Sequence, residues 1–354
     1  MGLRTSPRRL RWGAVAGAIL VTAALAAPAA AQAAGFRQVN LVSDKPGLAM
    51  LTDSNLVNPW GLSAGPTTPL WIADNGTDVS TIYPGAAGGM PISIAPLVVS
   101  IPGGAPTGTV FNPSTAFKVH VGSQDLPATF IFDSEAGTIT AWPFTDPPGK
   151  SATTEVTVPG AIFKGLAIAD GKLFASDFHN NEVAVFDSNW NLVDRFTDTG
   201  LPSGYAPFGI QTIGGHVFVT FAKQDADAED EVAGQGRGFV DEFDTSGNLV
   251  ARVAQHGQLN APWGLALAPA DFGRFSNDLL VGNFGDGQIN AYALGANGRY
   301  THKGELRENG HQITIDSLWA LEFGNNGNAG HTNELFFTAG PNDESHGLFG
   351  KITG

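Results

Sequence analysis

A short turn-and-strand pattern recurs along the chain at intervals of 44 to 56 residues, and this repeat constrains the fold more than any other feature. Most copies contain a glycine between an aromatic or polar residue and an aliphatic one, and an apolar strand follows. Repeats of this length are typical of domains that contain one small sheet per repeat. The copies are centred on Gly61, Thr115, Gly165, Gly209, Gly264 and Ala320. Six sheets are therefore expected.

Each repeat contains enough strand-forming sequence for a four-stranded sheet. Apolar runs such as Leu70–Asp74 and Ser80–Tyr83 are bounded by Gly, Asn and Asp, which is typical of strands joined by turns. The last repeat lacks a fourth strand, but the spare run Val39–Val42 precedes the first repeat. Pairing this run with the last sheet would leave no open edge. We therefore predict an all-β, six-bladed β-propeller over residues 34–354, closed by its N-terminal strand.

The N-terminal segment has the pattern of a signal peptide over residues 1–33. Four arginines precede an apolar run over residues 12–27, and Ala31-Gln32-Ala33 fits a cleavage site. This pattern predicts export to the periplasm or the extracellular medium, by either the Sec or the twin-arginine route. An uncleaved membrane anchor is the alternative. No other segment is long and apolar enough to span a bilayer.

Charge and composition exclude several functions. The net charge of −14 and the lack of a basic stripe after residue 40 argue against a nucleic-acid partner. The chain has no Cys, which removes disulfides, thiolate metal sites and Cys nucleophiles. The remaining partners are a small molecule or another protein, and we expect a monomer.

Three segments carry a resemblance to known proteins: Asn58–Leu62, Ile72–Gly76 and Val281–Gly287. The pattern of Trp-Gly-Leu, strand-Asp, turn and strand-Phe-Asp is similar to NHL-repeat and gluconolactonase-like six-bladed propellers. More closely, the chain resembles an uncharacterised family of exported bacterial proteins over nearly its whole mature length. The resemblance implies the fold and export, and it brings no activity with it.

Polar residues flank the predicted inner and second strands, at positions that share one rim of a propeller. Oxygen ligands around an axial channel filled with solvent would suit Ca²⁺ or another divalent cation. The resemblance to gluconolactonase-like enzymes implies a metal-dependent hydrolase or lactonase as one possible activity. The alternative for each residue is an ordinary turn, because Asp and Asn often bond to nearby backbone. The candidate metal ligands are Asn58, Asp74, Asn112, Asp133, Asp177, Asn260 and Asn283.

Two further features lie on the predicted rim. His179 follows a second strand and is the best-placed candidate for a base or ligand, with an ordinary exposed histidine as the alternative. The insertion at residues 223–238 fails the EF-hand pattern, so we expect a solvated loop, with a lid or partner contact as the functional alternative. Its acidic residues are Asp225, Asp227, Glu229, Asp230 and Glu231.

The tryptophans Trp60, Trp263 and Trp319 recur at one position of the repeat, and we expect them to pack between blades. Two functions remain open from the sequence. The favoured one is a binding or scaffold propeller that uses the channel mouth and the acidic loop. The alternative is the metal-dependent hydrolase at the same mouth.

Overall fold

The computed structural model describes residues 1–2, 35–87 and 90–354, and residues 34–354 form one compact unit. The predicted signal peptide, apart from its first two residues, lies outside the described residues. No helix of the described residues is long and apolar enough to cross a membrane.

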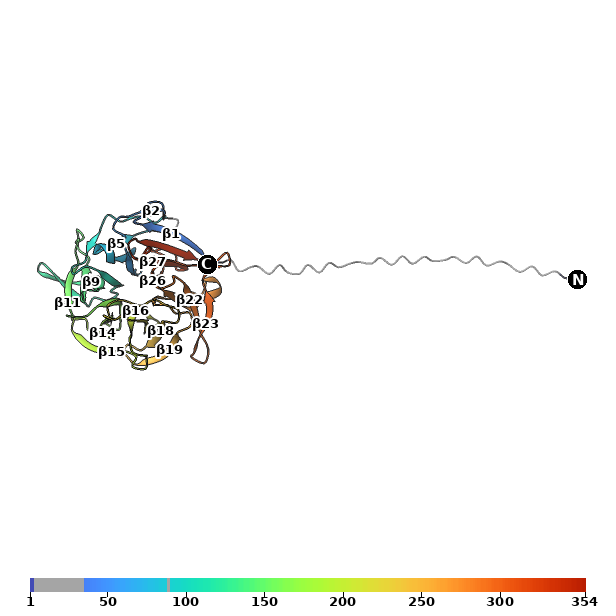
Figure 1. Cartoon of the computed structure of the whole chain (residues 1–354). Helices are drawn as coiled ribbons and strands as arrows, with labels where there is room; N and C mark the ends of the chain where they lie inside the picture. The colour runs from blue at the N-terminus through green and yellow to red at the C-terminus, as the bar shows by residue number, and fades with distance from the viewer. Residues whose placement is uncertain (3–34, 88–89) are drawn as a thin grey trace. The chain divides into compact units, whose positions relative to one another are not determined.

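Six sheets are arranged around a common axis, as a β-propeller (Figure 1). The prediction of fold class is confirmed. The inner strands are β3 (Pro59–Ser63), β7 (Pro106–Phe111), β12 (Phe163–Ala169), β16 (Tyr205–Ile213), β20 (Pro262–Leu267) and β26 (Leu318–Phe323). The second strands are β4 (Leu70–Asp74), β9 (Gln124–Ser134), β13 (Lys172–Asp177), β17 (His216–Lys223), β21 (Leu279–Asn283) and β27 (Glu334–Ala339).

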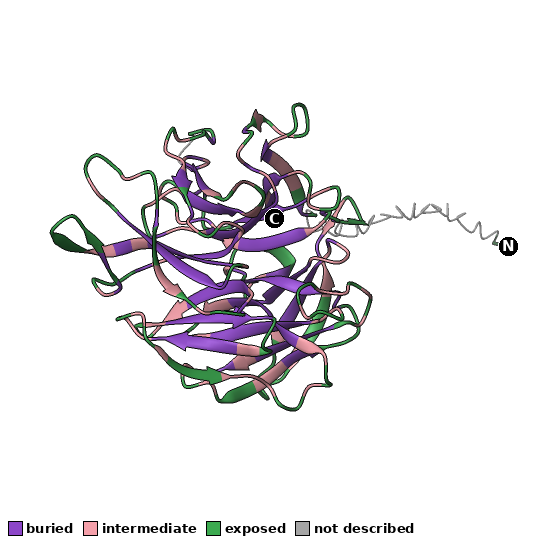
Figure 2. Cartoon of the chain, turned by 60° about the vertical axis from the view of Figure 1, so that its left-hand side comes forward, coloured by how far each residue is buried: buried purple, intermediate pink, exposed green. Residues whose placement is uncertain are grey.

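Burial falls from the inner strands to the outer ones, so apolar side chains gather in the inner part of each blade (Figure 2). The third strands are β5 (Val79–Tyr83), β10 (Thr138–Pro143), β14 (Glu182–Phe186), β18 (Gly238–Phe243), β22 (Ile289–Leu294) and β28 (Leu348–Thr353). The outer strands are β6 (Val99–Ser100), β11 (Thr153–Thr157), β15 (Leu192–Phe196), β19 (Leu249–Gln255), β23 (Tyr300–Glu305) and β1 (Arg37–Ser43).

The remaining elements are short and lie at the edges of the blades. Strand β2 extends the last blade by parallel pairing with β1, and β8 forms a hairpin with the first part of β9. They are β2 (Leu51–Thr52), β8 (Lys118–Val121), β24 (Arg307–Glu308), β25 (His311–Gln312), and the 3₁₀ turns η1 (Asn75–Thr77) and η2 (Gly273–Phe275).

The ring is closed by the N-terminal strand. Strand β1 pairs antiparallel with β28, from Arg37 opposite Thr353 to Ser43 opposite Leu348. Leu41 and Val42 are buried by this pairing. The predicted closure by residues 39–42 is therefore confirmed, with a strand that is a few residues longer.

The recurring glycine allows neighbouring inner strands to approach each other. A Cβ at Gly209 would lie 2.0 Å from the carbonyl oxygen of Trp263, and one at Gly264 would lie 2.4 Å from that of Trp319. Since no side chain can occupy these positions, glycine at this place in the repeat is a packing requirement. The glycine thus fixes the position of its neighbours around the axis.

The predicted start of the second blade was wrong. Its inner strand is β7, and Asn112 lies after this strand, at the opposite end from Asn58. The inner-strand glycine of this blade is Gly108, because a Cβ there would lie 2.3 Å from the backbone nitrogen of Leu166 in the next blade. Asn112 builds a turn instead, with its Nδ2 donating to the carbonyls of Ala116 and Ala128.

Candidate functional site

At one end of the axis, which we call the entrance face, the inner strands begin and the second strands end. The antiparallel pairing of Pro59 with Asp74 shows this arrangement in the first blade. The second residue of each of the six repeat openings lies at this end of its inner strand. These residues are Trp60, Thr107, Lys164, Phe208, Trp263 and Trp319.

Four of these six residues are aromatic and pack against one another; we call Trp60, Phe208, Trp263 and Trp319 the aromatic plug. The rings of Trp60 and Trp319 stack with centroids 3.6 Å apart, and Trp263 meets Trp319 edge-on at 5.8 Å. All four side chains are buried. The tryptophans therefore pack across the axis rather than between blades alone, and this end of the channel is filled with rings where a solvent-filled mouth was expected.

Lys164 takes the position that a ring occupies in four other blades, and its side chain is only 1% exposed. Its Nζ lies 2.5 Å from Oε1 of Glu135 and 3.2 Å from Oδ1 of Asp230. The same ammonium lies 5.2 Å from the ring centroid of Trp60, within cation–π range. Burial acts to lower the pKa of Lys164, but the nearby carboxylates raise it above its ordinary value, so the lysine is charged.

Four carboxyl groups surround this ammonium, and we call Glu135, Asp230, Glu231 and Glu344 the carboxylate cluster. Burial raises the pKa of Glu231 to about 8, and Lys164 offsets only part of that rise. Burial also raises the pKa of Glu344, although a hydrogen bond from Asn58 opposes this. The single lysine therefore leaves the cluster with more carboxyl groups than positive charge, and two of them retain protons more strongly than usual.

A continuous hydrogen-bond network joins the aromatic plug to the carboxylate cluster. Trp319 Nε1 donates to Asn58 Oδ1 at 3.1 Å, and Asn58 Nδ2 donates to Glu344 Oε2 at 2.7 Å. Asn75 Nδ2 donates to Glu135 Oε2 at 3.0 Å, and Asn58 Nδ2 lies 3.3 Å from Asn75 Oδ1. These bonds place residues from the first, second and last blades around Lys164.

The acidic loop at residues 223–238 lies over this cluster. It is folded back on itself, because Asp225 N donates to the Asp230 carbonyl at 2.9 Å and Val232 N donates to the Lys223 carbonyl at 2.7 Å. Asp227, Glu229 and Asp230 are exposed on it. The loop thus covers the buried lysine, because Asp230 binds Lys164 below it, and we call the loop the lid.

Neighbouring turns hold the two ends of this lid. Gln224 Nε2 donates to the Phe178 carbonyl at 2.6 Å, and Gly234 N donates to Asn260 Oδ1 at 2.5 Å. His179, predicted as a base or ligand, has its Nδ1 3.2 Å from the Ala228 carbonyl and so contacts the middle of the lid. The neighbour of this ring is therefore the lid backbone, and a role of His179 as a base or ligand stays a prediction.

The seven predicted metal ligands do not converge on one point. Asp133 Oδ1 accepts hydrogen bonds from Thr107 and Gly108 inside the second blade. Asp177 accepts from Ile162 and Asn180, as the alternative of an ordinary turn predicts.

Four other members of the set lie in three separate places. Asp74 is fully buried, and neither of its oxygens has a hydrogen-bond partner among the described residues. Asn260 and Asn283 both donate to Asp286 in one turn, and Asn58 belongs to the network around Lys164. No group of three or more His, Asp or Glu side chains suited to a metal ion occurs in the described part of the chain. The predicted divalent cation therefore has no site formed by these residues together.

Sequence reasoning missed the residues at the centre of the site. These residues are Lys164, Glu135 and Glu344, and their residue types do not recur at the same positions of the other repeats. A signal was present, because Phe163-Lys164-Gly165 aligns with Pro59-Trp60-Gly61 and substitutes a cation for a ring.

The fold and this rim define the chain as a six-bladed β-propeller with a covered, acidic mouth. It is 34% identical over 325 residues to uncharacterized protein R648 of Acanthamoeba polyphaga mimivirus, across 88% of this chain and 78% of that protein. Uncharacterized protein L690 of the same virus is 31% identical over 88% of this chain and 84% of its own length. The chain belongs to the family of these mimivirus proteins. These relatives are viral, so they do not support the expected bacterial origin of the family.

No family model matches the chain. Among solved structures, the soluble aldose sugar dehydrogenase of Escherichia coli is similar with a TM-score of 0.55 and 15% identity, over 90% of this chain and 99% of that one. A streptogramin B lyase is similar with a TM-score of 0.51 and 12% identity, over 90% and 97%. At these identities the likeness shows the propeller fold alone.

Proposed function

We propose that this protein is a binding propeller that holds a cationic partner, such as a Lys- or Arg-bearing segment of another protein, at its acidic mouth. The observation that carries this proposal is the carboxylate cluster, in which four carboxyl groups share the single ammonium of Lys164. A second cation beside them would stabilise the ionised carboxylates that burial now disfavours.

The residues around the carboxylate cluster also favour a positively charged partner. The lid presents exposed Asp227 and Glu229, and the turns of the last two blades add Asp286, Asp316 and Asp343 on the same face. Acidic residues outnumber Lys223 and Arg237 on the lid, and a surface with an excess of one charge attracts partners of the opposite sign and raises their rate of association. The lid carboxylate of Asp230 is bound to Lys164, so displacing the lid would free a carboxylate for the partner.

Binding of tetra-arginine tests this function, since arginine stays charged across the useful pH range. The double variant Glu231→Gln, Glu344→Gln should bind tetra-arginine about tenfold more weakly, because charges close to a bound cation contribute most. Isothermal titration calorimetry at low salt measures the affinity for tetra-arginine. Asp125→Asn removes one charge from the exposed β8–β9 hairpin and should change the affinity less than about twofold. Equal binding of tetracitrulline, the uncharged analogue, would reject the proposal.

We also propose that the chain is exported and that residues 1–33 are removed. The arginines and the apolar run that precede Ala34 support this. Expression of the full chain in a bacterium should give a protein outside the cytoplasm whose N-terminal sequence begins at or near Ala34. An intact N-terminus on membrane-bound protein would favour the anchor instead.

A further inference from the structure

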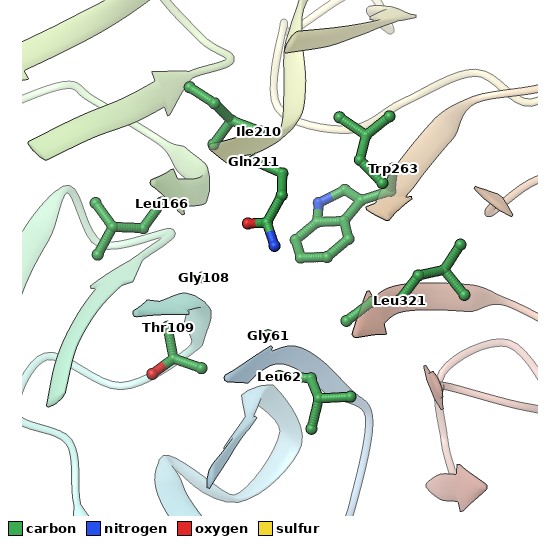
Figure 3. A pocket seen from close by; sticks show the side chains of 11 residues that line it. Gly61, Leu62, Gly108, Thr109, Leu166, Ile210, Gln211, Trp263 and Leu321 are labelled. Atoms are coloured by element: carbon green, nitrogen blue, oxygen red, sulfur yellow. The ribbon is translucent and has the colours of Figure 1, made fainter. Parts of the chain in front are cut away.

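The opposite end of the axis, which we call the exit face, is open where the entrance face is filled. A cavity of about 260 Å³ lies there, lined by residues from β3, β7, β12, β16 and β26. Leu62, Thr109 and Gln211 also line a narrower space of about 30 Å³ deeper along the axis, which reaches Trp263 (Figure 3). The two spaces together form a blind pocket, open at the exit face and closed by the aromatic plug; we call it the exit pocket.

The polar groups of the exit pocket are few and lie together near the axis. Gln211 Nε2 donates to Glu322 Oε2 at 3.2 Å, so side chains of β16 and β26 meet across the channel. Figure 3 shows the amide of Gln211 turned toward the middle of the space. Thr109 is 6% exposed, and its Oγ1 has no hydrogen-bond partner among the described residues. This oxygen is itself buried, so Thr109 does not present its hydroxyl to the pocket.

The charge state of Glu322 decides which ligands suit this pocket. Burial raises the pKa of Glu322 to about 8, and the hydrogen bond from Gln211 offsets only part of this. At neutral pH the carboxyl is therefore mostly protonated and can donate an O–H. No other residue on the described lining is titratable, since its neighbours there are Thr, Ser, Gln and apolar side chains. The pocket thus offers uncharged donors and acceptors between apolar walls such as Leu62, Ile168 and Phe111.

We propose that the exit pocket is a second binding site, for a small uncharged ligand that carries several hydroxyl groups and is no larger than about a monosaccharide. Glu322 and Gln211 hydrogen-bond to its hydroxyls, and the aliphatic and aromatic walls pack on its carbon skeleton. This site lies on the other face from the acidic mouth, so it stands independently of the cationic partner proposed above.

Ligand-observed NMR with D-glucose, D-galactose and myo-inositol as probes tests the site. At least one probe should bind with a Kd below about 10 mM at pH 6.5, and its affinity should fall at least fivefold as the pH rises through about 8, because ionised Glu322 can no longer donate. Glu322→Gln keeps an N–H donor and should bind with an affinity that does not change with pH. Gln211→Leu removes the amide with little change of volume and should weaken binding.

Two results would overturn this inference. One is the absence of binding by every probe to folded wild-type protein. The other is a probe whose affinity is the same in the wild type, Glu322→Gln and Gln211→Leu at every pH, which would place it elsewhere on the surface. The melting temperature of each variant shows that the comparison concerns folded proteins. Tetra-arginine binding should be unchanged in both variants, which separates this test from that of the acidic mouth.

Discussion

Lys164→Met is expected to lower the free energy of unfolding by about 3 to 5 kcal/mol at pH 8, because it leaves a group of partly buried carboxylates without its buried cation. Nζ of Lys164 bonds to Glu135 and Asp230 and lies near the rings of Trp60 and Phe178, and methionine is also an unbranched side chain that packs well against rings. The loss therefore comes from charge rather than from volume. Urea unfolding at several pH values measures it.

The direction in which folding stability changes with pH follows from the pKa shifts of Lys164 and Glu231. The pKa of Lys164 is raised, so its stabilisation is present below its ordinary value of 10.5 and is lost only as the pH rises past the folded value. The pKa of Glu231 is raised from 4.5 to about 8, so the folded state loses stability relative to the unfolded one as the pH rises across that interval. The deficit of the variant should therefore be largest at pH 8 and should shrink toward pH 5, where Glu231 is protonated.

The control for this variant is Lys118→Met, which removes a charge from an exposed position on β8. It should change stability by less than about 0.5 kcal/mol at any pH. A Lys164→Met protein as stable as the wild type at pH 8 would mean that Lys164 does not hold the mouth together.

Removal of strand β1 is expected to have the second large effect. A chain that starts at residue 45 lacks the antiparallel partner of β28 and exposes the edge of the last blade. We expect a melting temperature lower by about 10 °C or more, together with self-association through the free edge. Circular dichroism and size-exclusion chromatography measure both effects.

A peptide of residues 35–44 should restore the shortened protein, because a free strand can add to an open sheet edge. A chain that starts at residue 35 keeps β1 and is the matched control. An unchanged melting temperature after loss of β1 would show that the ring does not depend on this closure.

The repeat made most of the fold predictable, because the close approach of inner strands requires a small residue at one position in every blade. The glycines at 61, 165, 209 and 264 marked four blades correctly. The inner strand of the second blade was misplaced because Pro106-Thr107-Gly108 lacks the usual ring, while Asn112-Pro113 resembles the Asn58-Pro59 opening. The prediction therefore took Asn112-Pro113, which follows the inner strand of this blade, for the turn that precedes it.

The site was less predictable, because it depends on residues that break the repeat. Recurring Asp and Asn, such as Asp133 and Asp177, serve the backbone of their own blades. The side chains that converge, Lys164, Glu135 and Glu344, come from separate blades and recur nowhere in the pattern. These side chains come together because of the angles between blades, and those angles cannot be derived from a single sequence. Glu322 and Gln211, at the exit face, were missed for the same reason.

The central claim, that the covered mouth binds a cation through carboxyls that hold protons, is tested most directly by counting the protons released on binding. Titration calorimetry of tetra-arginine in two buffers with different ionisation enthalpies gives this number. At pH 7 we expect release of on the order of one proton, because the bound cation lowers the raised pKa of Glu231 and Glu344, and at pH 9.5 we expect none. Binding with no proton release at pH 7, or with proton uptake, would contradict the account.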